Sequence, residues 1–301
     1  MKLKYVIYMI VVGLSIASCS EDNHLTGVEE PTAEQEKVTV HINLQQELPN
    51  IATRATTPMP LEHANKIYDL WILHYTDEGL IVRSDIKQVT LSTAAIETTL
   101  NPTLTITKQN EKGTICLIAN LGSQQMEWPE NLGDLKKTQL LSLPFDNTGL
   151  YTDKMYMFGY YEGPIKDKMS LNILMGRMAA CMNIVISANS SYTLNAQITN
   201  AVTTTHFFPM EEGDDRADLK YSTFSDNSKS VSNGSPLALY YYTGENIAPE
   251  TSRRTTIKIT ATSGRNSKTY TIELGADSPN VENRNYSIYR NNNYTFNINL
   301  K

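Results

Sequence analysis

The stretch VTVHINL, residues 38–44, gives the clearest indication of the fold of this chain. Apolar residues occupy every even position and polar residues lie between them, which is typical of a β-strand with one buried face. We therefore expect order to begin at Lys37, with this stretch as the first strand and His41 on its polar face. The acidic residues 19–36 before it show no apolar period, so we expect them to form a tether.

Similar short runs, separated by Gly, Pro and Asn, continue downstream and are predicted to be strands. A leucine pattern predicts one short helix at Asn131–Leu143. The expected strands are Tyr68–Tyr75, Leu80–Val82, Val89–Leu91, Thr103–Thr107, Thr114–Asn120, Leu171–Met175, Met182–Ile186, Leu194–Ile198, Leu239–Tyr242, Thr255–Thr260, Thr269–Leu274 and Tyr294–Leu300.

A break near Gly163–Asp167 divides these runs into two comparable groups. The pattern predicts an all-β fold with minor α content, built as two consecutive β-sandwich domains over residues 37–164 and 165–301. Two stretches lack periodicity and are expected to be exposed loops: PNIATRATTPMP at 49–60, and the acidic, then Ser/Asn-rich stretch Glu211–Ser235.

Composition narrows the function classes. The chain has 301 residues with a net charge of −6, so it lacks the clustered positive charge that nucleic acids demand, and we expect no nucleic-acid partner. No internal stretch reaches the roughly 18 apolar residues of a membrane-spanning helix.

The N-terminus carries an export signal. Lys2 and Lys4 precede about a dozen apolar residues, which is the pattern of a signal peptide, here residues 1–18. The following Ile16-Ala17-Ser18-Cys19 resembles a bacterial lipobox, in which the cysteine thiol is diacylated. Two or more acyl chains give stable membrane anchoring. The alternative is that Cys19 is an ordinary thiol after a conventional cleavage site.

Motifs for catalysis are missing. The five histidines have no paired ligand spacing, and the sequence holds no CxxC, P-loop, GxGxxG or GxSxG. We expect no enzyme activity, no catalytic residue, no metal site and no cofactor. Two alternatives stay open: a glycosidase carboxylate pair, which leaves no local signature, and calcium binding by the acidic run 211–218, which is otherwise a solvated loop.

Two further residue groups have alternative interpretations. Cys116 and Cys181 lie in apolar runs and are expected to be buried thiols, although a disulfide between them is also conceivable in an exported protein. The tyrosines at 160–161 and 240–242 are expected to alternate between core and surface. Exposed together on one face, they would instead stack on sugars.

Three features together resemble the fimbrillins, the lipoprotein pilins of Bacteroidales. They are the lipobox, the Arg54-containing loop after the first strand, and the C-terminal run IYRNNNYTFNINL at 288–300. The aromatic stretch YYYTGEN at 240–246 and the hairpin predicted at 255–274 are also similar to that family. The resemblance implies two β-sandwich domains and a structural or adhesive role in a surface fimbrium.

The resemblance also implies a mechanism. Fimbrillins are often cut after an arginine in the loop that follows the first strand, and the matching bond here is Arg54–Ala55. Removal of the first strand would leave a groove that a partner subunit fills by donor-strand exchange. The implied donor is Tyr294–Lys301, whose Tyr294, Phe296, Ile298 and Leu300 alternate as such a strand requires. Within one molecule the same segment can instead be an ordinary strand.

The implied partners are other fimbrial subunits, of the same or another kind, and the outer membrane through the lipid. The receptor is unknown. The expected location is the cell surface at the outer membrane, or the fimbrium after cleavage at Arg54. The main alternative function is a lipid-anchored, carbohydrate-binding surface lipoprotein of a glycan-uptake system.

We predict that Cys19→Ala abolishes acylation and releases the protein from the membrane fraction, because the sulfur that carries the lipid is gone. Metabolic labelling with a palmitate analogue and membrane fractionation would test this. Cys116→Ala is the matched control and should leave both readouts unchanged. A Cys19→Ala protein that stays acylated and membrane-bound would contradict the lipobox interpretation.

Overall fold

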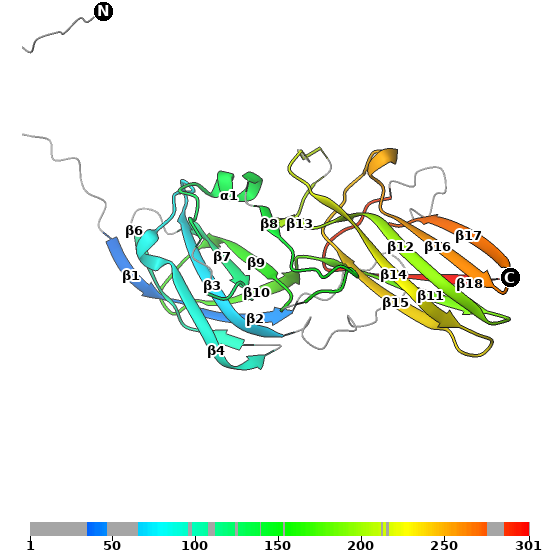
Figure 1. The fold of residues 1–301 in the computed structure, drawn as a ribbon. Coiled ribbons are helices and arrows are strands. Elements are labelled where there is room, and N and C mark those ends of the chain that lie inside the picture. The colour runs from blue at the N-terminus through cyan, green and yellow to red at the C-terminus, as the bar shows by residue number, and fades with distance from the viewer. Residues whose placement is uncertain are drawn as a thin grey trace, which may run out of the picture. The chain divides into compact units, whose positions relative to one another are not determined.

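The protein is described from a computed structural model, in which strands dominate (Figure 1). Residues 34–301 form one compact unit. No helix among the residues described has both the length and the apolar character that crossing a membrane requires. The structure describes residues 35–46, 66–95, 98–107, 112–123, 126–138, 140–152, 154–211, 213–214, 217–275 and 286–300.

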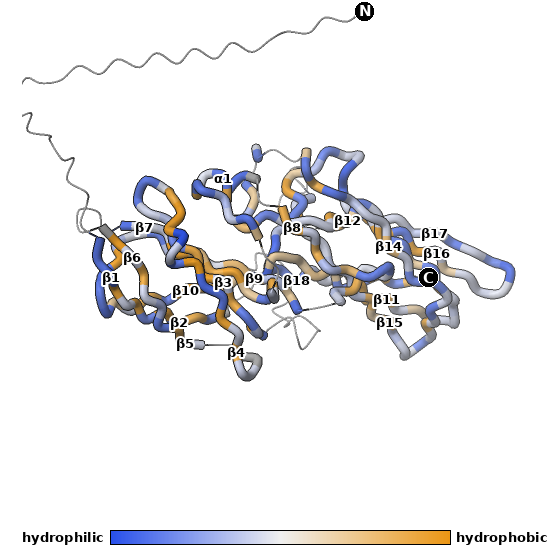
Figure 2. Tube along the Cα trace, turned by 60° about the vertical axis from the view of Figure 1, so that its left-hand side comes forward, coloured by the Kyte–Doolittle hydropathy of each residue, from blue (hydrophilic) through white to orange (hydrophobic). Residues whose placement is uncertain are grey.

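The first group of strands centres on a seven-stranded sheet in the order β4-β3-β7-β9-β10-β2-β5. Residues of β3 and β7 are buried or half-buried along nearly their whole length, and the hydrophobic colour of β3 is visible in Figure 2. Most of these strands lie where the sequence predicted them. The bounds are β2 His41–Gln46, β3 Ile67–Thr76, β4 Lys87–Ala95, β5 Thr98–Leu100, β7 Lys112–Ala119, β9 Met157–Pro164 and β10 Ser170–Arg177.

The predicted first strand is in fact two strands, β1 Gln35–Thr39 and β2, divided at Val40. The Val40 N–H donates to the Pro102 carbonyl oxygen at 3.1 Å instead of to a ladder partner. β1 pairs antiparallel with β6, Thr103–Thr107, whereas β2 joins the seven-stranded sheet. Residues 35 and 36, predicted as the end of the tether, belong to β1, and the rest of the predicted tether lies outside the described residues.

The second group of strands forms a sandwich around its own apolar cluster. One sheet has the order β15-β11-β18 and the other β14-β12-β16-β17. The strands again cover the predicted runs, with one addition, β14. The bounds are β11 Ala180–Ala188, β12 Tyr192–Val202, β14 Tyr221–Val231, β15 Leu237–Thr243, β16 Thr256–Ser263, β17 Asn266–Glu273 and β18 Asn293–Leu300.

The expected loop Glu211–Ser235 contains β14, so this prediction is wrong. β14 is an edge strand that places Phe224 and Val231 in the core while its other side chains are mostly polar and solvent-facing. Edge strands commonly carry polar residues that discourage further pairing. Because few of its residues are apolar, β14 shows no apolar alternation in the sequence.

The predicted helix is also too long. The helix α1 covers Leu132–Thr138, and Leu140–Ser142 forms the strand β8, which pairs with β13, Thr204–His206. Asn131 caps α1, because its side-chain oxygen accepts from the Gly133 N–H at 2.8 Å. The predicted strand Leu80–Val82 consists only of isolated bridges, followed by the short 3-10 helix η2, Arg83–Asp85; a second one, η3, is Thr251–Arg253.

Sheet membership changes at Met178–Ala179 rather than at 164/165, because β10 pairs with β9 and β2 of the first group. β9 itself, which was not predicted, approaches β10 closely. A Cβ on Gly159 would lie 2.4 Å from the Leu174 carbonyl oxygen, so only glycine fits there. The division into two domains stays a prediction.

A further apolar cluster combines side chains from both groups of strands, including Trp128, Phe158, Phe207 and Tyr242. Cys116 and Cys181 belong to it, and both are buried free thiols without a disulfide. Burial raises the pKa of both thiols, that of Cys181 to about 12. The interpretation as buried thiols is confirmed.

A buried polar network fastens β6, and through it β1, to the first group. The Asp85 carboxylate bonds to His74 Nδ1 at 2.9 Å and accepts from the Thr105 N–H and hydroxyl at 2.6 and 2.9 Å. Burial of Asp85 opposes ionisation, but the hydrogen bonds from His74 and Thr105 outweigh it, so its pKa lies below the ordinary value.

We predict that Asp85→Ala lowers the free energy of unfolding by about 3 kcal/mol at pH 7, because it leaves buried partners unpaired. Since the folded-state pKa is depressed, this stabilisation is present above the unfolded-state pKa. The difference between the wild-type protein and the variant should shrink as the pH falls from about 5 towards 3. Urea unfolding at several pH values would measure it. The exposed Glu127→Ala is the control, and a gap independent of pH would contradict the assignment.

Candidate functional site

The first two strands fill a groove in the first group of strands. Val38, Val40, Ile42 and Leu44 are 2%, 0%, 0% and 1% exposed, and their side chains belong to the apolar cluster of that group. β2 lies between β10, with which it runs parallel, and the short antiparallel β5. We call the space that these four side chains occupy, between β10, β5 and β6, the first-strand groove.

A polar ladder fixes the register of β2 in this groove. Asn43 pairs with Asn172 of β10 in the ladder, and its side-chain nitrogen donates to the Asn172 side-chain oxygen at 3.2 Å. On the other side, the Thr99 hydroxyl donates to the Asn43 oxygen at 3.2 Å. A shift by one residue would break both bonds and turn the apolar side chains out of the groove.

The C-terminal strand β18 pairs in parallel with β11, and among the described residues it has no second partner strand. Tyr294, Ile298 and Leu300 are buried, and Phe296 is half-buried. Burial raises the pKa of Tyr294 to about 12, and its hydroxyl oxygen accepts from the Tyr289 N–H at 3.0 Å. The four predicted donor side chains therefore belong to a strand that is paired within its own chain.

The two terminal strands are alike in sequence and in pairing. VTVHINLQ at 38–45 and YTFNINLK at 294–301 share Thr at their second position and Ile-Asn-Leu at their fifth to seventh positions. The β2 part of the first stretch pairs in parallel with β10, and β18 pairs in parallel with β11, whereas Val38 and Thr39 belong to β1 and pair antiparallel with β6. Each strand has an asparagine that bonds to its parallel neighbour: the Ser187 hydroxyl of β11 donates to the Asn299 oxygen, and the Asn43 nitrogen donates to the Asn172 oxygen.

Arg290 anchors the chain just before β18. The residue is 8% exposed, and its guanidinium forms an ion pair with Glu245 at 2.6 Å and donates to the carbonyl oxygens of His206, Phe207 and Phe208 at 2.9, 2.8 and 3.0 Å. Glu245 also accepts from the Met210 N–H at 3.1 Å. Both Arg290 and Glu245 lie in stretches that resemble fimbrillin motifs, but the sequence gives no sign that the two side chains meet.

Other predicted site residues fall into two groups. Cys19, Arg54 and Ala55 lie outside the described residues, so lipidation and processing stay predictions. Of the tyrosines, Tyr160 is 47% exposed, whereas Tyr241 is fully buried. The tyrosines therefore do not form one exposed sugar-stacking face.

The acidic run 211–218 folds partly on itself, since the Asp214 carboxylate accepts from the Glu211 N–H at 2.7 Å. Within the residues that the structure describes, which leave out positions 212, 215 and 216 of this run, no three His, Cys, Asp or Glu side chains are grouped to hold a metal.

No protein-family model matches the chain, and no curated protein matches it. Several solved structures match it. A candidate cell adhesion protein from Parabacteroides distasonis superposes with a TM-score of 0.61 at 16% identity, covering 87% of this chain and 88% of the other. The C-terminally truncated tip fimbrial protein Mfa3 from Porphyromonas gingivalis superposes with a TM-score of 0.60 at 12% identity, covering 88% of this chain and 96% of the other.

A candidate cell adhesion protein from Bacteroides eggerthii gives a TM-score of 0.53 at 17% identity, covering 88% of this chain and 87% of the other. At such low identities the similarity establishes the fold. The chain has the all-β, β-sandwich fold of these adhesion and fimbrial proteins, which confirms the fold that the fimbrillin resemblance implied.

We predict that Arg290→Met lowers the free energy of unfolding by about 3–5 kcal/mol, because it leaves the Glu245 carboxylate and three carbonyls without their buried partner. Urea unfolding at pH 7 would measure the loss. Arg83→Met removes an ion pair to Glu130 with side chains 55% and 71% exposed, and should cost less than about 1 kcal/mol. Equal losses in the two variants would show that Arg290 is not an anchor.

Proposed function

We propose that the chain is a structural subunit of a surface fimbrium, exported as an outer-membrane lipoprotein and assembled by donor-strand exchange after cleavage at Arg54–Ala55. A second copy of the chain can act as the donor. The observation that carries the proposal is the likeness of the two terminal strands, VTVHINL and YTFNINL. The proposed role involves no catalysis.

Cleavage at Arg54–Ala55 would detach β1 and β2 from the rest of the chain. Their departure would expose the apolar floor of the first-strand groove and the unpaired backbone of β10 and β6. Buried backbone N–H and C=O groups rarely stay unpaired, and an open sheet edge recruits a strand. The cleaved subunit is thus an acceptor.

The C-terminal strand matches this acceptor in its lower half. In the register of β2, Ile298 and Leu300 take the places of Ile42 and Leu44, and Asn299 faces Asn172. In the upper half, Tyr294 and Phe296 replace two valines, so the groove must widen there to avoid overpacking. The side chains that define the register are the ones that are identical.

Exchange also offers more pairing than the strand's own site. In its own chain β18 forms one ladder, with β11, and leaves Phe296 half-exposed. In the first-strand groove, a strand is flanked by both β10 and β5. The intermolecular site therefore pairs both edges of the donor strand, whereas its own site pairs one.

N-terminal mass spectrometry of sheared surface fibres tests the proposal directly. We expect a mature start at Ala55, and we expect Arg54→Ala to leave the protein on the membrane and out of fibres. The control Arg253→Ala, in η3 outside the cleavage loop, should not change either result. Fibres whose subunits begin at Cys19 would exclude exchange through the first-strand groove.

A peptide experiment separates assembly from folding. A labelled peptide of residues 294–301 should bind the cleaved protein and not the uncut protein, whose groove is filled. Ile298→Asp in the peptide should abolish binding, because it places a charge in a buried pocket, whereas Asn297→Asp, which would take the half-exposed place of His41, should not. Equal binding of both peptides would contradict the proposed register.

A further inference from the structure

The outer edge of β6 is held by a side chain rather than by a strand. β6 forms one wall of the first-strand groove, and among the described residues β1 is its only partner strand. Removal of the first strands would therefore leave β6 without a ladder. We propose that Asp85 is a positioning residue of the acceptor, which keeps β6 in place while the groove is empty. This inference rests on the proposed assembly by strand exchange and names a residue on which that assembly depends.

The Asp85 carboxylate takes the place of a neighbouring strand. One of its oxygens accepts from the Thr105 N–H at 2.6 Å, and the other accepts from the Thr105 hydroxyl at 2.9 Å. In an antiparallel ladder only every second residue of a strand bonds to a given partner, and Thr105 is a residue whose N–H faces away from β1. The lowered pKa of Asp85 keeps it ionised at neutral pH, and bonds to a carboxylate are stronger than bonds between neutral groups.

The support of Asp85 does not pass through the strands that leave. His74 Nδ1, on β3 inside the seven-stranded sheet, bonds to the Asp85 carboxylate at 2.9 Å, and the Asp85 N–H donates to the Val82 carbonyl oxygen at 2.9 Å. His74 and Asp85 are 1% and 3% exposed. A second tie to β6, from the Lys87 ammonium to the Thr103 carbonyl oxygen at 3.2 Å, is a single bond. β6 is thus fastened to the part of the fold that stays after cleavage.

Apolar packing would hold β6 less firmly once the groove is empty. Leu104 of β6 shares its apolar cluster with Val38 and Val40, which cleavage would remove. A cavity of about 60 Å³ beside Thr105 and Ile106 also leaves this side of β6 incompletely packed, and atoms that line a void lose contacts. The bonds from Asp85 therefore matter most in the cleaved protein.

The position of β6 decides how the upper half of an incoming strand is received. Residues 37–39 of β1 lie opposite residues 103–105 of β6. A donor in the register of the first strands would place Tyr294 and Thr295 opposite Leu104 and Thr103. If β6 moved, this ladder would be lost, whereas the lower half would still pair with β10 and β5. A wall that is already in place strengthens binding, because the incoming strand does not have to order it.

Binding of the native first strands tests the inference without relying on the donor. The probe is a labelled peptide of residues 35–46, titrated by fluorescence anisotropy against protein cleaved at Arg54–Ala55 and separated from its N-terminal fragment. We expect Asp85→Ala to weaken binding about tenfold or more, the effect of one lost charge-assisted hydrogen bond. Asp85→Asn keeps an oxygen that can accept from the Thr105 N–H, and it should restore the affinity to within about threefold of the wild-type value.

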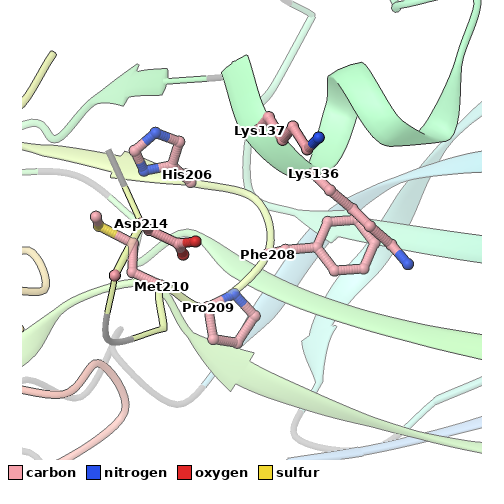
Figure 3. Close-up of a pocket in the computed structure, with 8 residues that line it drawn as sticks. Lys136, Lys137, His206, Phe208, Pro209, Met210 and Asp214 are labelled. Carbon is pink, nitrogen blue, oxygen red and sulfur yellow. The ribbon is translucent and has the colours of Figure 1, made fainter. Parts of the chain in front are cut away.

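Phe208→Ala is the control for a general loss of stability. The Phe208 ring is buried against Phe158 and Tyr160 and lies beside Lys136 (Figure 3). Its apolar cluster is a different one from that of the first-strand groove. The variant should lose stability, as large-to-small core changes do, and still bind the peptide as the wild-type protein does. Equal weakening by Phe208→Ala and Asp85→Ala, or no weakening by Asp85→Ala, would overturn the inference.

Hydrogen exchange on the uncut chain gives an independent readout. Asp85→Ala should speed amide exchange in β1 and β6 about tenfold or more and leave β2 near its wild-type rate, because only β6 loses its support. Thr105→Val removes the hydroxyl bond alone, so it should give a smaller change in the same two strands, and it serves if Asp85→Ala does not fold. Uniform acceleration over the whole first group of strands would contradict the inference.

The outcomes separate the role of Asp85 from the assembly proposal. Wild-type cleaved protein that binds the peptide 35–46 but not the peptide 294–301 would overturn exchange with the C-terminal strand and leave the role of Asp85 in place. Wild-type and Asp85→Ala proteins that bind both peptides equally well would overturn the role of Asp85 and leave the assembly proposal standing.

Discussion

Burial of four side chains from the first two strands is the constraint on which the first half of this fold depends. Val38, Val40, Ile42 and Leu44 are nearly inaccessible to solvent, and they complete a core built by strands that follow much later in the chain. At about 1.5–3 kcal/mol for each buried apolar side chain, their contribution is on the order of 6–12 kcal/mol. A typical domain has about 5–15 kcal/mol of net stability. The groove therefore cannot remain empty, whichever strand occupies it.

Local pattern predicted most of the strands because alternation is a property of neighbouring residues. It failed where a long-range contact decided the structure. The apolar alternation continues through Val40, but the strand is divided there because the Val40 N–H bonds to Pro102. Leu140 fits the helical pattern of leucines, but it belongs to β8 because that strand pairs with β13. β14 was missed for the opposite reason: its edge position requires only Phe224 and Val231 to be apolar.

The candidate sites were less predictable than the fold. The alternation of β18 and the loop arginine are visible in sequence, and so is the likeness of the two terminal strands once their pairing is known. The Arg290–Glu245 anchor joins residues 45 positions apart, and its carbonyl partners at 206–208 lie more than 80 positions before Arg290. No spacing rule connects such residues, because only the tertiary fold brings them together.

The two buried thiols have a consequence for how this molecule responds to oxidants. Cys116 and Cys181 lie in one core cluster, and the raised pKa of each keeps the reactive thiolate scarce. Both sulfurs are protected from oxidants as long as the core is closed. Their rate of alkylation in the native protein therefore reports how often the core opens, so each thiol can serve as a built-in probe of local unfolding.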